Sequence, residues 1–271
     1  MFAKLLKHDF KSTWGVIGLL CLVSLGAGIL GGGAMRYLVW IEGRGGEEMT
    51  VPTVLCILTM IVSILFIAVC GVGALFALIW RFYKSRFTDE GYLTFTLPVT
   101  SHQILLSSMV NSAVNMLIVG ITTFVSVMVL MLFGFSALDG FWTDFWEAIA
   151  GVIQDIAKSL TGREIGYLLQ MLFTAIAAFA CELAVLMLSV TIGALAAKKH
   201  KILAAVGIYY GIHLALTVVN AVFVGTVVLT EAGSSAVATK LFWEQGLFVL
   251  LVGVCSYFLM HYLVSKKLNL N

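Results

Sequence analysis

The 271-residue chain has few charged residues and only two prolines. Charged residues make up 11% of the sequence and hydrophobic residues 61%, whereas soluble domains carry roughly 25% charged residues. The prolines are Pro52 and Pro98, so little in the sequence interrupts long helices. This composition excludes a soluble domain and predicts an all-α polytopic membrane protein with a single domain, residues 1–271.

Several motifs of catalytic proteins are also missing. The five cysteines lie in apolar runs, and no pair has the spacing of a metal site. The chain lacks the G-x-x-x-x-G-K-[ST] phosphate-binding loop of ATPases. The apolar segments do not supply the convergent His, Asp and Glu residues that a metal or hydrolytic site needs. We therefore expect that the chain is not an enzyme and binds no metal or cofactor.

Six apolar segments are long enough to cross a hydrocarbon core about 30 Å thick, which takes about 20 residues. They are residues 14–34, 53–80, 104–135, 166–197, 202–230 and 241–264. Eleven lysines and arginines lie at the two termini and after the second and fourth segments, and five lie in the other connections. Because basic loops stay in the cytoplasm, we expect both termini to be cytoplasmic. Most acidic residues lie on the other side, where they either favour cationic cargo or only make the loops soluble.

Two segments outside these spans are amphipathic. In residues 1–13, apolar and basic residues fall on opposite sides of a helix, which predicts a cytoplasmic N-terminal helix on the membrane surface. In residues 136–165, aromatic and aliphatic residues recur at helical spacing among acidic ones. This pattern predicts one or two helices at the outer interface, anchored by Trp142 and Trp146. The outer segment acts either as a gate or only as an interfacial anchor.

The connection 81–103, between the second and third spans, is the most informative polar stretch. Three basic residues open it, Arg81, Lys84 and Arg86. Thr88 and the acids after it are typical of a helix N-terminus, and Pro98 ends the apolar run that follows. Residues 100–103 have the Thr-x-x-Gln pattern of a capping box. The connection therefore predicts a short surface helix between two spans.

The sequence DEGYLTFTLPVTSHQILLSS, residues 89–108, resembles the same connection in small bacterial ABC-2 type transporter permeases. The shared features are the run Glu-Gly-Tyr-Leu and the Leu-Pro pair four residues later. The resemblance implies a coupling helix that docks on a separate ATP-hydrolysing subunit. The residues that it assigns to this contact are Asp89, Glu90, Gly91, Tyr92, Leu93, Leu97 and Pro98.

The same resemblance implies the permease subunit of an exporter in the plasma membrane of a bacterium. Two permease chains, identical or different, would form the pathway as a dimer, and the partner ATPase would bind ATP and Mg²⁺. No nucleic acid is implied as a partner. In that family the dimer forms largely through the first and fifth spans. The pairs Gly28/Gly32 and Gly207/Gly211 lie on these spans at a spacing that lets membrane helices approach closely.

Ionisable residues within membrane spans are costly and are usually functional. Glu182 lies in the fourth span, His213 in the fifth and His261 near the end of the sixth. Glu182 is the candidate for the pathway, as a proton relay or a cargo contact; otherwise it is a hydrogen-bonded packing residue. A different class of function also fits the composition, namely a polytopic membrane sensor or assembly factor that transports nothing and has no ATPase partner.

Overall fold

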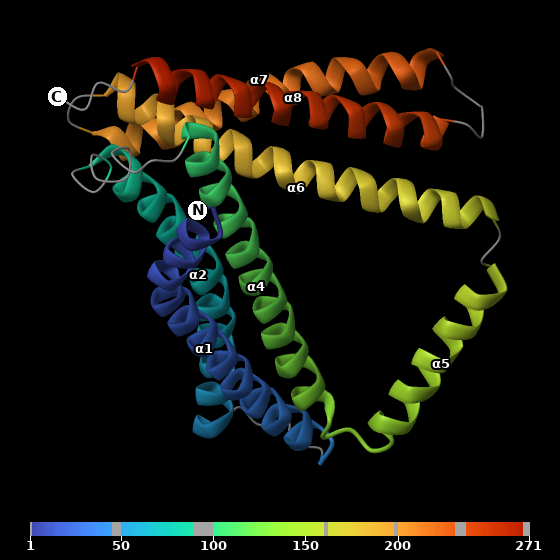
Figure 1. The fold of residues 1–271 in the computed structure, drawn as a ribbon. Coiled ribbons are helices and arrows are strands. Elements are labelled where there is room, and N and C mark those ends of the chain that lie inside the picture. Colours follow the sequence, from blue (N-terminus) through green and yellow to red (C-terminus); the bar gives the residue numbers. More distant parts are fainter. Residues whose placement is uncertain are drawn as a thin grey trace. The chain divides into compact units, whose positions relative to one another are not determined.

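The computed structural model describes residues 2–44, 50–88, 91, 100–159, 162–197, 200–230 and 237–267. No strand occurs among these residues, and the predicted all-α class is confirmed (Figure 1). The helices are α1 (Phe2–Glu42), α2 (Val51–Phe87), α4 (Ser101–Phe135), α5 (Phe141–Ser159), α6 (Gly162–Ala196), α7 (Lys201–Thr230) and α8 (Val237–Lys267).

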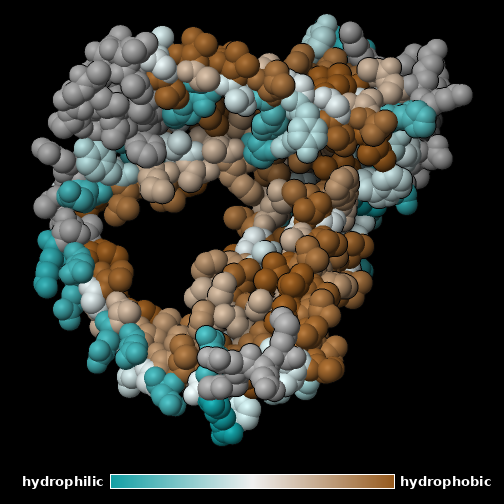
Figure 2. Space-filling model, turned by 180° about the vertical axis from the view of Figure 1, so that it is seen from behind, coloured by the Kyte–Doolittle hydropathy of each residue, from teal (hydrophilic) through white to brown (hydrophobic). Residues whose placement is uncertain are grey.

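Every helix in the described part of the chain except α5 is long and apolar enough to cross a membrane, which gives six spans. The first is 41 residues long, or about 60 Å at 1.5 Å per residue, so it exceeds a hydrocarbon core about 30 Å thick. Many large hydrophobic side chains on these helices are exposed, and hydrophobic residues cover much of the face in Figure 2. The fold is that of a multi-pass membrane protein.

The helices extend beyond the apolar segments that mark them in the sequence. α1 runs without a break from Phe2 to Glu42, so the amphipathic N-terminal segment is the start of the first span's helix and not a separate helix. Its basic side chains are nevertheless exposed and its apolar ones half-buried, as the pattern predicted. No proline separates the two parts, so the backbone hydrogen bonds continue.

The predicted outer segment forms one helix, α5, which begins after a turn at Gly140. This glycine has a φ of 78°, a conformation that glycine adopts without steric cost. Asp144 lies in the first turn of α5 and Lys158 in the last, where each charge complements the helix dipole. Hydrophilic and hydrophobic side chains lie on opposite sides of α5 (Figure 2). The predicted amphipathic helix is therefore present.

The helices pack as two compact units. The first unit is Met1–Asp9, Ile79–Ala113 and Leu160–Asn271, and the second is Phe10–Leu78 and Val114–Ser159. In the first unit α6 packs against both α7 and α8. A Cβ atom at Gly253 of α8 would lie 3.1 Å from Cα of Cys181, so the glycine permits this approach. The buried core of this unit is Phe82, Leu105, Met187, Leu188, Val190, Ala205, Met260 and Val264.

The second unit is held by close contacts between α1 and α4. A Cβ atom at Gly28 would lie 2.5 Å from the carbonyl oxygen of Ser126, and one at Gly32 would lie 3.1 Å from that of Leu130. The buried hydroxyls of Ser24 and Ser126 are 2.9 Å apart and hydrogen-bond across the same contact. Small residues thus let the two helices approach closely. Both glycines are buried within the chain, so the close contact that they serve here is internal. The interchain contact that the resemblance implied for them stays a prediction.

Candidate functional site

Of the seven residues assigned to ATPase coupling, the structure describes only Gly91. Asp89, Glu90, Tyr92, Leu93, Leu97 and Pro98 lie outside the described residues. The backbone N–H of Gly91 donates to the carbonyl oxygen of Thr88 at 2.7 Å. A Cβ atom at Gly91 would lie 2.5 Å from the carbonyl oxygen of Arg86. A glycine is therefore required here because the chain turns back on the end of α2.

Threonine hydroxyls make hydrogen bonds at both helix ends that border this segment. Thr100 caps α4, because its Oγ1 accepts a hydrogen bond from the backbone N–H of Gln103 at 3.4 Å. The helix start predicted at Thr88 falls largely on residues outside the described part of the chain, so the cap role of Thr88 stays a prediction. The Thr88 hydroxyl donates to the carbonyl oxygen of Lys84 at 2.6 Å and so completes the last turn of α2.

A buried ion pair lies where α2 ends and α4 begins. Arg86 Nη2 is 3.2 Å from Asp9 Oδ2, and Arg86 is only 2% exposed. The same nitrogen donates to Ser108 Oγ at 2.6 Å and to the carbonyl oxygen of Ile104 at 3.3 Å. Ser107 Oγ donates to Asp9 Oδ2 at 3.0 Å. We call Asp9, Arg86, Ser107 and Ser108 the ion-pair cluster.

The ion-pair cluster joins three segments that are far apart in sequence. Asp9 comes from the start of α1, Arg86 from the last turn of α2 and the two serines from the second turn of α4. The sequence marked Arg86 only as one of three basic residues after the second span, and its burial is a finding of the structure. A guanidinium can be buried here because a carboxylate, a hydroxyl and a carbonyl oxygen accept its N–H groups. The one signal in the sequence was Asp9, a lone acid in a basic segment.

A second polar cluster lies within the spans of the first unit. The Tyr209 hydroxyl donates to Glu182 Oε1, and His213 Nε2 is 3.4 Å from Glu182 Oε2. Tyr209 and His213 are one turn apart on α7, and their ring centroids are 4.4 Å apart. We call these three residues the Glu182 cluster. Sequence reasoning had marked Glu182 and His213 separately and had missed Tyr209; the structure brings them together.

The Glu182 cluster is partly exposed. The side chain of Glu182 is 41% exposed and that of His213 36%. Charges are costly against lipid and usually face the interior of a helix bundle or a water-filled cavity. This side of α6 and α7 is therefore expected to meet water or protein and not lipid alone.

His261, the third ionisable residue singled out, contacts the start of α4. Its ring stacks on that of His102 with centroids 3.6 Å apart and an interplanar angle of 11°. His102 Nδ1 is 3.1 Å from the Tyr257 hydroxyl. These contacts join the first turn of α4 to the end of α8. They make His261 a packing residue near the cytoplasmic connection inferred from the sequence.

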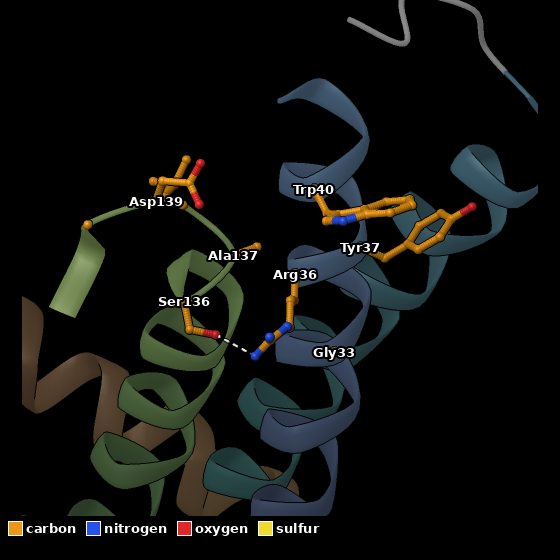
Figure 3. Close-up of a pocket in the computed structure, with 9 residues that line it drawn as sticks. Gly33, Arg36, Tyr37, Trp40, Ser136, Ala137 and Asp139 are labelled. Atoms are coloured by element: carbon orange, nitrogen blue, oxygen red, sulfur yellow. Dashed lines mark hydrogen bonds between the residues drawn. The ribbon is translucent and has the colours of Figure 1, made fainter. Parts of the chain in front are cut away.

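A cavity of about 520 Å³ lies between the end of α1 and the connection from α4 to α5. In Figure 3, Arg36 points towards Ser136, and its Nη1 donates to the Ser136 hydroxyl at 2.9 Å. Asp139 lies on the other side of the cavity. Arg36 also lies 5.5 Å from the ring centroid of Phe133. The cavity is open and polar, and its contacts position the turn that begins α5.

The other glycine pair, Gly207 and Gly211, faces outward on α7. No atom lies within 4 Å of a Cβ placed at either position, and both residues are exposed. Their predicted role in a dimer contact stays a prediction. Within the described residues, no group of three or more His, Cys, Asp or Glu side chains could hold a metal ion.

Comparisons with protein-family models, with curated proteins and with solved structures each found no match to this chain. The class that the fold defines is a multi-pass, all-α membrane protein.

Proposed function

We propose that the chain is the membrane-spanning permease subunit of an ABC-2 type exporter in a bacterial plasma membrane. It would form the translocation pathway as a dimer with a second permease chain, and a separate ATPase subunit would drive it. The proposal rests on the resemblance of residues 89–108 to the coupling segment of such permeases. ATP and Mg²⁺ belong to the partner in this scheme, since the chain has no phosphate-binding loop of its own.

The observation that supports the proposal best is the ion-pair cluster. It holds together the two helices that border residues 89–99, and it adds the start of α1 through Asp9. A displacement of the segment by a docked ATPase would act on the ends of three helices at once. A loosely held loop would absorb the same displacement. In this proposal the cluster is the base through which a movement of the segment would reach the three helices.

The decisive experiment tests the coupling segment against the ATPase. Replacing Glu90 and Tyr92 together by alanine removes an acidic and an aromatic side chain from the predicted surface segment. Loss of one aromatic interface anchor can cost about 2 kcal/mol, roughly thirtyfold in affinity. We expect the double variant to insert and fold but to co-purify with less ATPase, or to hydrolyse ATP without transport.

The matched control is Asp144→Ala, an exposed change on α5 that leaves the segment intact. It should keep full ATPase association. If the double variant also keeps full association and transport, the segment does not couple the two subunits. If no ATPase associates with the unaltered chain, a sensor or assembly factor becomes the better reading.

The orientation of the chain is part of the proposal and is tested by thiol labelling. Three lysines flank His200 between α6 and α7, and such a cluster resists translocation. A cysteine introduced by His200→Cys should react with an impermeant thiol reagent only after the membrane is opened, on a background without the native cysteines. Labelling in intact cells would reverse the orientation.

A further inference from the structure

The Glu182 carboxylate has acceptor capacity that the fold leaves unused. An ionised carboxylate offers about four acceptor positions on its two oxygens. Tyr209 uses one of them, and His213 Nε2, at 3.4 Å from Oε2, lies beyond the usual hydrogen-bond range. The carboxylate is also partly exposed. A negative group in a membrane span is thus left open on one side, where a positive ligand can approach.

The chemistry around the carboxylate does not suit a metal ion. Calcium takes six to eight oxygen ligands and magnesium about six. The Glu182 cluster offers one carboxylate, one phenol and one imidazole. No larger group of metal-binding side chains occurs in the described part of the chain. An inorganic cation would therefore remain mostly without protein ligands.

The surroundings suit a cation that carries apolar groups. Tyr210 and Leu214, the residues that follow Tyr209 and His213 on α7, are 68% and 69% exposed. The rings of Tyr209 and Tyr210 meet edge to face with centroids 5.6 Å apart. Aromatic faces attract organic ammonium and phosphonium groups, and exposed aliphatic side chains contact their substituents. One carboxylate then supplies the single counter-charge that such a ligand needs.

A proton pathway through the cluster finds no continuation along α7. Towards Thr230, the Thr217 hydroxyl donates to the carbonyl oxygen of His213 at 2.8 Å, and Gln245 Nε2 donates to Asn220 Oδ1 at 2.5 Å. Hydroxyl and amide side chains do not titrate near neutral pH. Asn220 is seven residues beyond His213, about 10 Å along the helix at 1.5 Å per residue. The cluster is therefore an isolated charged site and not one link in a described chain of titratable groups.

From these contacts we propose that the Glu182 cluster is a binding site for a hydrophobic organic cation. Glu182 is the counter-ion, the Tyr209 hydroxyl orients its carboxylate, and the tyrosine rings contact the ligand. His213 lies beside the second carboxylate oxygen when no ligand is bound and moves aside when the cation enters. As a cargo site this rests on the proposed export function, but binding itself needs neither ATP nor the ATPase.

The test measures equilibrium binding of tetraphenylphosphonium to the purified full-length chain in detergent micelles. Wild-type protein should bind the cation saturably, and tetrabutylammonium should displace it while neutral triphenylphosphine oxide should not. Glu182→Gln should lose about tenfold or more in affinity, equivalent to about 1.4 kcal/mol. Glu164→Gln makes the same charge change at an exposed position on α6 and should bind normally.

The variant His213→Gln distinguishes a cation-binding site from a pair of Glu182 and His213 that shares a proton. In a cation site its affinity for tetraphenylphosphonium should stay equal to wild type or rise, because the competing imidazole is gone. A loss as large as that of Glu182→Gln would overturn the proposal in favour of a coupled pair. Displacement by the neutral oxide, or unchanged affinity in Glu182→Gln, would also overturn it. The displacement measurements use wild-type protein, so they decide the matter even if a variant fails to fold.

Because no ATPase is present in these measurements, the outcome is independent of the coupling experiment. Failure to bind the cation removes the ligand class and leaves the permease proposal standing. Normal cation binding together with normal ATPase association in the Glu90/Tyr92 double variant would remove the coupling assignment and leave the binding site.

Discussion

Two carboxylates of the same packing unit differ in their exposure and in their partners. Asp9 is only 8% exposed and receives hydrogen bonds from Arg86 and Ser107. The side chain of Glu182 is 41% exposed, with one phenol bound and an imidazole at 3.4 Å. Asp9 faces a guanidinium, which is permanently charged, whereas the charge of an imidazole depends on protonation.

The difference indicates what each carboxylate does. A buried charge that the fold neutralises completely has no capacity left for a ligand, and its removal harms the fold. A partly exposed charge that the fold neutralises incompletely can bind something else, and its removal harms the fold little. We therefore infer a structural role for Asp9 and a binding role for Glu182. The following predictions test this contrast, beginning with the largest expected effect on stability.

Arg86→Met should be the most damaging of the three changes. It leaves the Asp9 carboxylate buried without its cation, and breaking a buried pair in this way costs about 3–5 kcal/mol. The free energy of unfolding, measured by denaturant titration in mixed micelles, should fall by this amount. Adding Asp9→Leu should recover much of the loss, because no uncompensated charge then remains. A loss no greater than that of Lys84→Met, an exposed position on the same helix, would contradict the structural role.

Ser108→Ala should have an intermediate effect. Its hydroxyl oxygen accepts N–H groups of Arg86 at 2.6 and 3.2 Å, and hydrogen bonds to charged groups contribute about 1.5–3 kcal/mol. The same unfolding measurement should show a loss within that range. Ser265→Ala is the control, because this exposed serine bonds only a carbonyl of its own helix, that of Tyr262. Equal losses in the two variants would mean that the guanidinium does not depend on Ser108.

Glu182→Gln should change the free energy of unfolding by less than about 1 kcal/mol, as expected for a partly exposed position. The glutamine oxygen can still accept the Tyr209 hydroxyl, so the contact between α6 and α7 is kept. Transport of a cationic substrate into membrane vesicles should nevertheless fall. If stability falls as far as in Arg86→Met, the contrast between the two carboxylates disappears. If neither stability nor transport changes, Glu182 has no binding role.

Local features of the sequence predicted much of the fold. The six spans follow from hydropathy and length, and each predicted segment overlaps the corresponding helix. The amphipathic pattern of residues 136–165 predicted α5, and the capping pattern predicted the start of α4. These features depend on residues within a few turns of each other, which is why they can be read directly. The continuity of α1 does not follow from these local features, because a change from an amphipathic to an apolar pattern predicts two separate helices.

The candidate sites depended on pairs that are distant in the chain. Asp9 and Arg86 are 77 positions apart, and Glu182 and Tyr209 are 27 apart. The sequence indicated that Gly28 serves close helix packing. It did not indicate that the residue packed against Gly28 is Ser126 of the same chain. The spacing of small residues shows that another helix can approach closely, but it does not show which helix lies there. The coupling role of residues 89–98 stays a prediction.

By itself, the sequence determined that this is an all-α membrane protein with six spans, because burying about 20 apolar residues in lipid leaves the backbone only its own carbonyls to bond. Only the tertiary structure decided which charges are neutralised within the chain. An ion pair or a hydrogen bond forms within about 3 Å, and no local pattern indicates which side chains from different helices come that close. For this reason the sequence shows Arg86 only as one of three basic residues in a polar connection, whereas the structure places it at the centre of a buried cluster. Glu182, a lone acid in the sequence, has Tyr209 and His213 beside its partly exposed carboxylate in the structure.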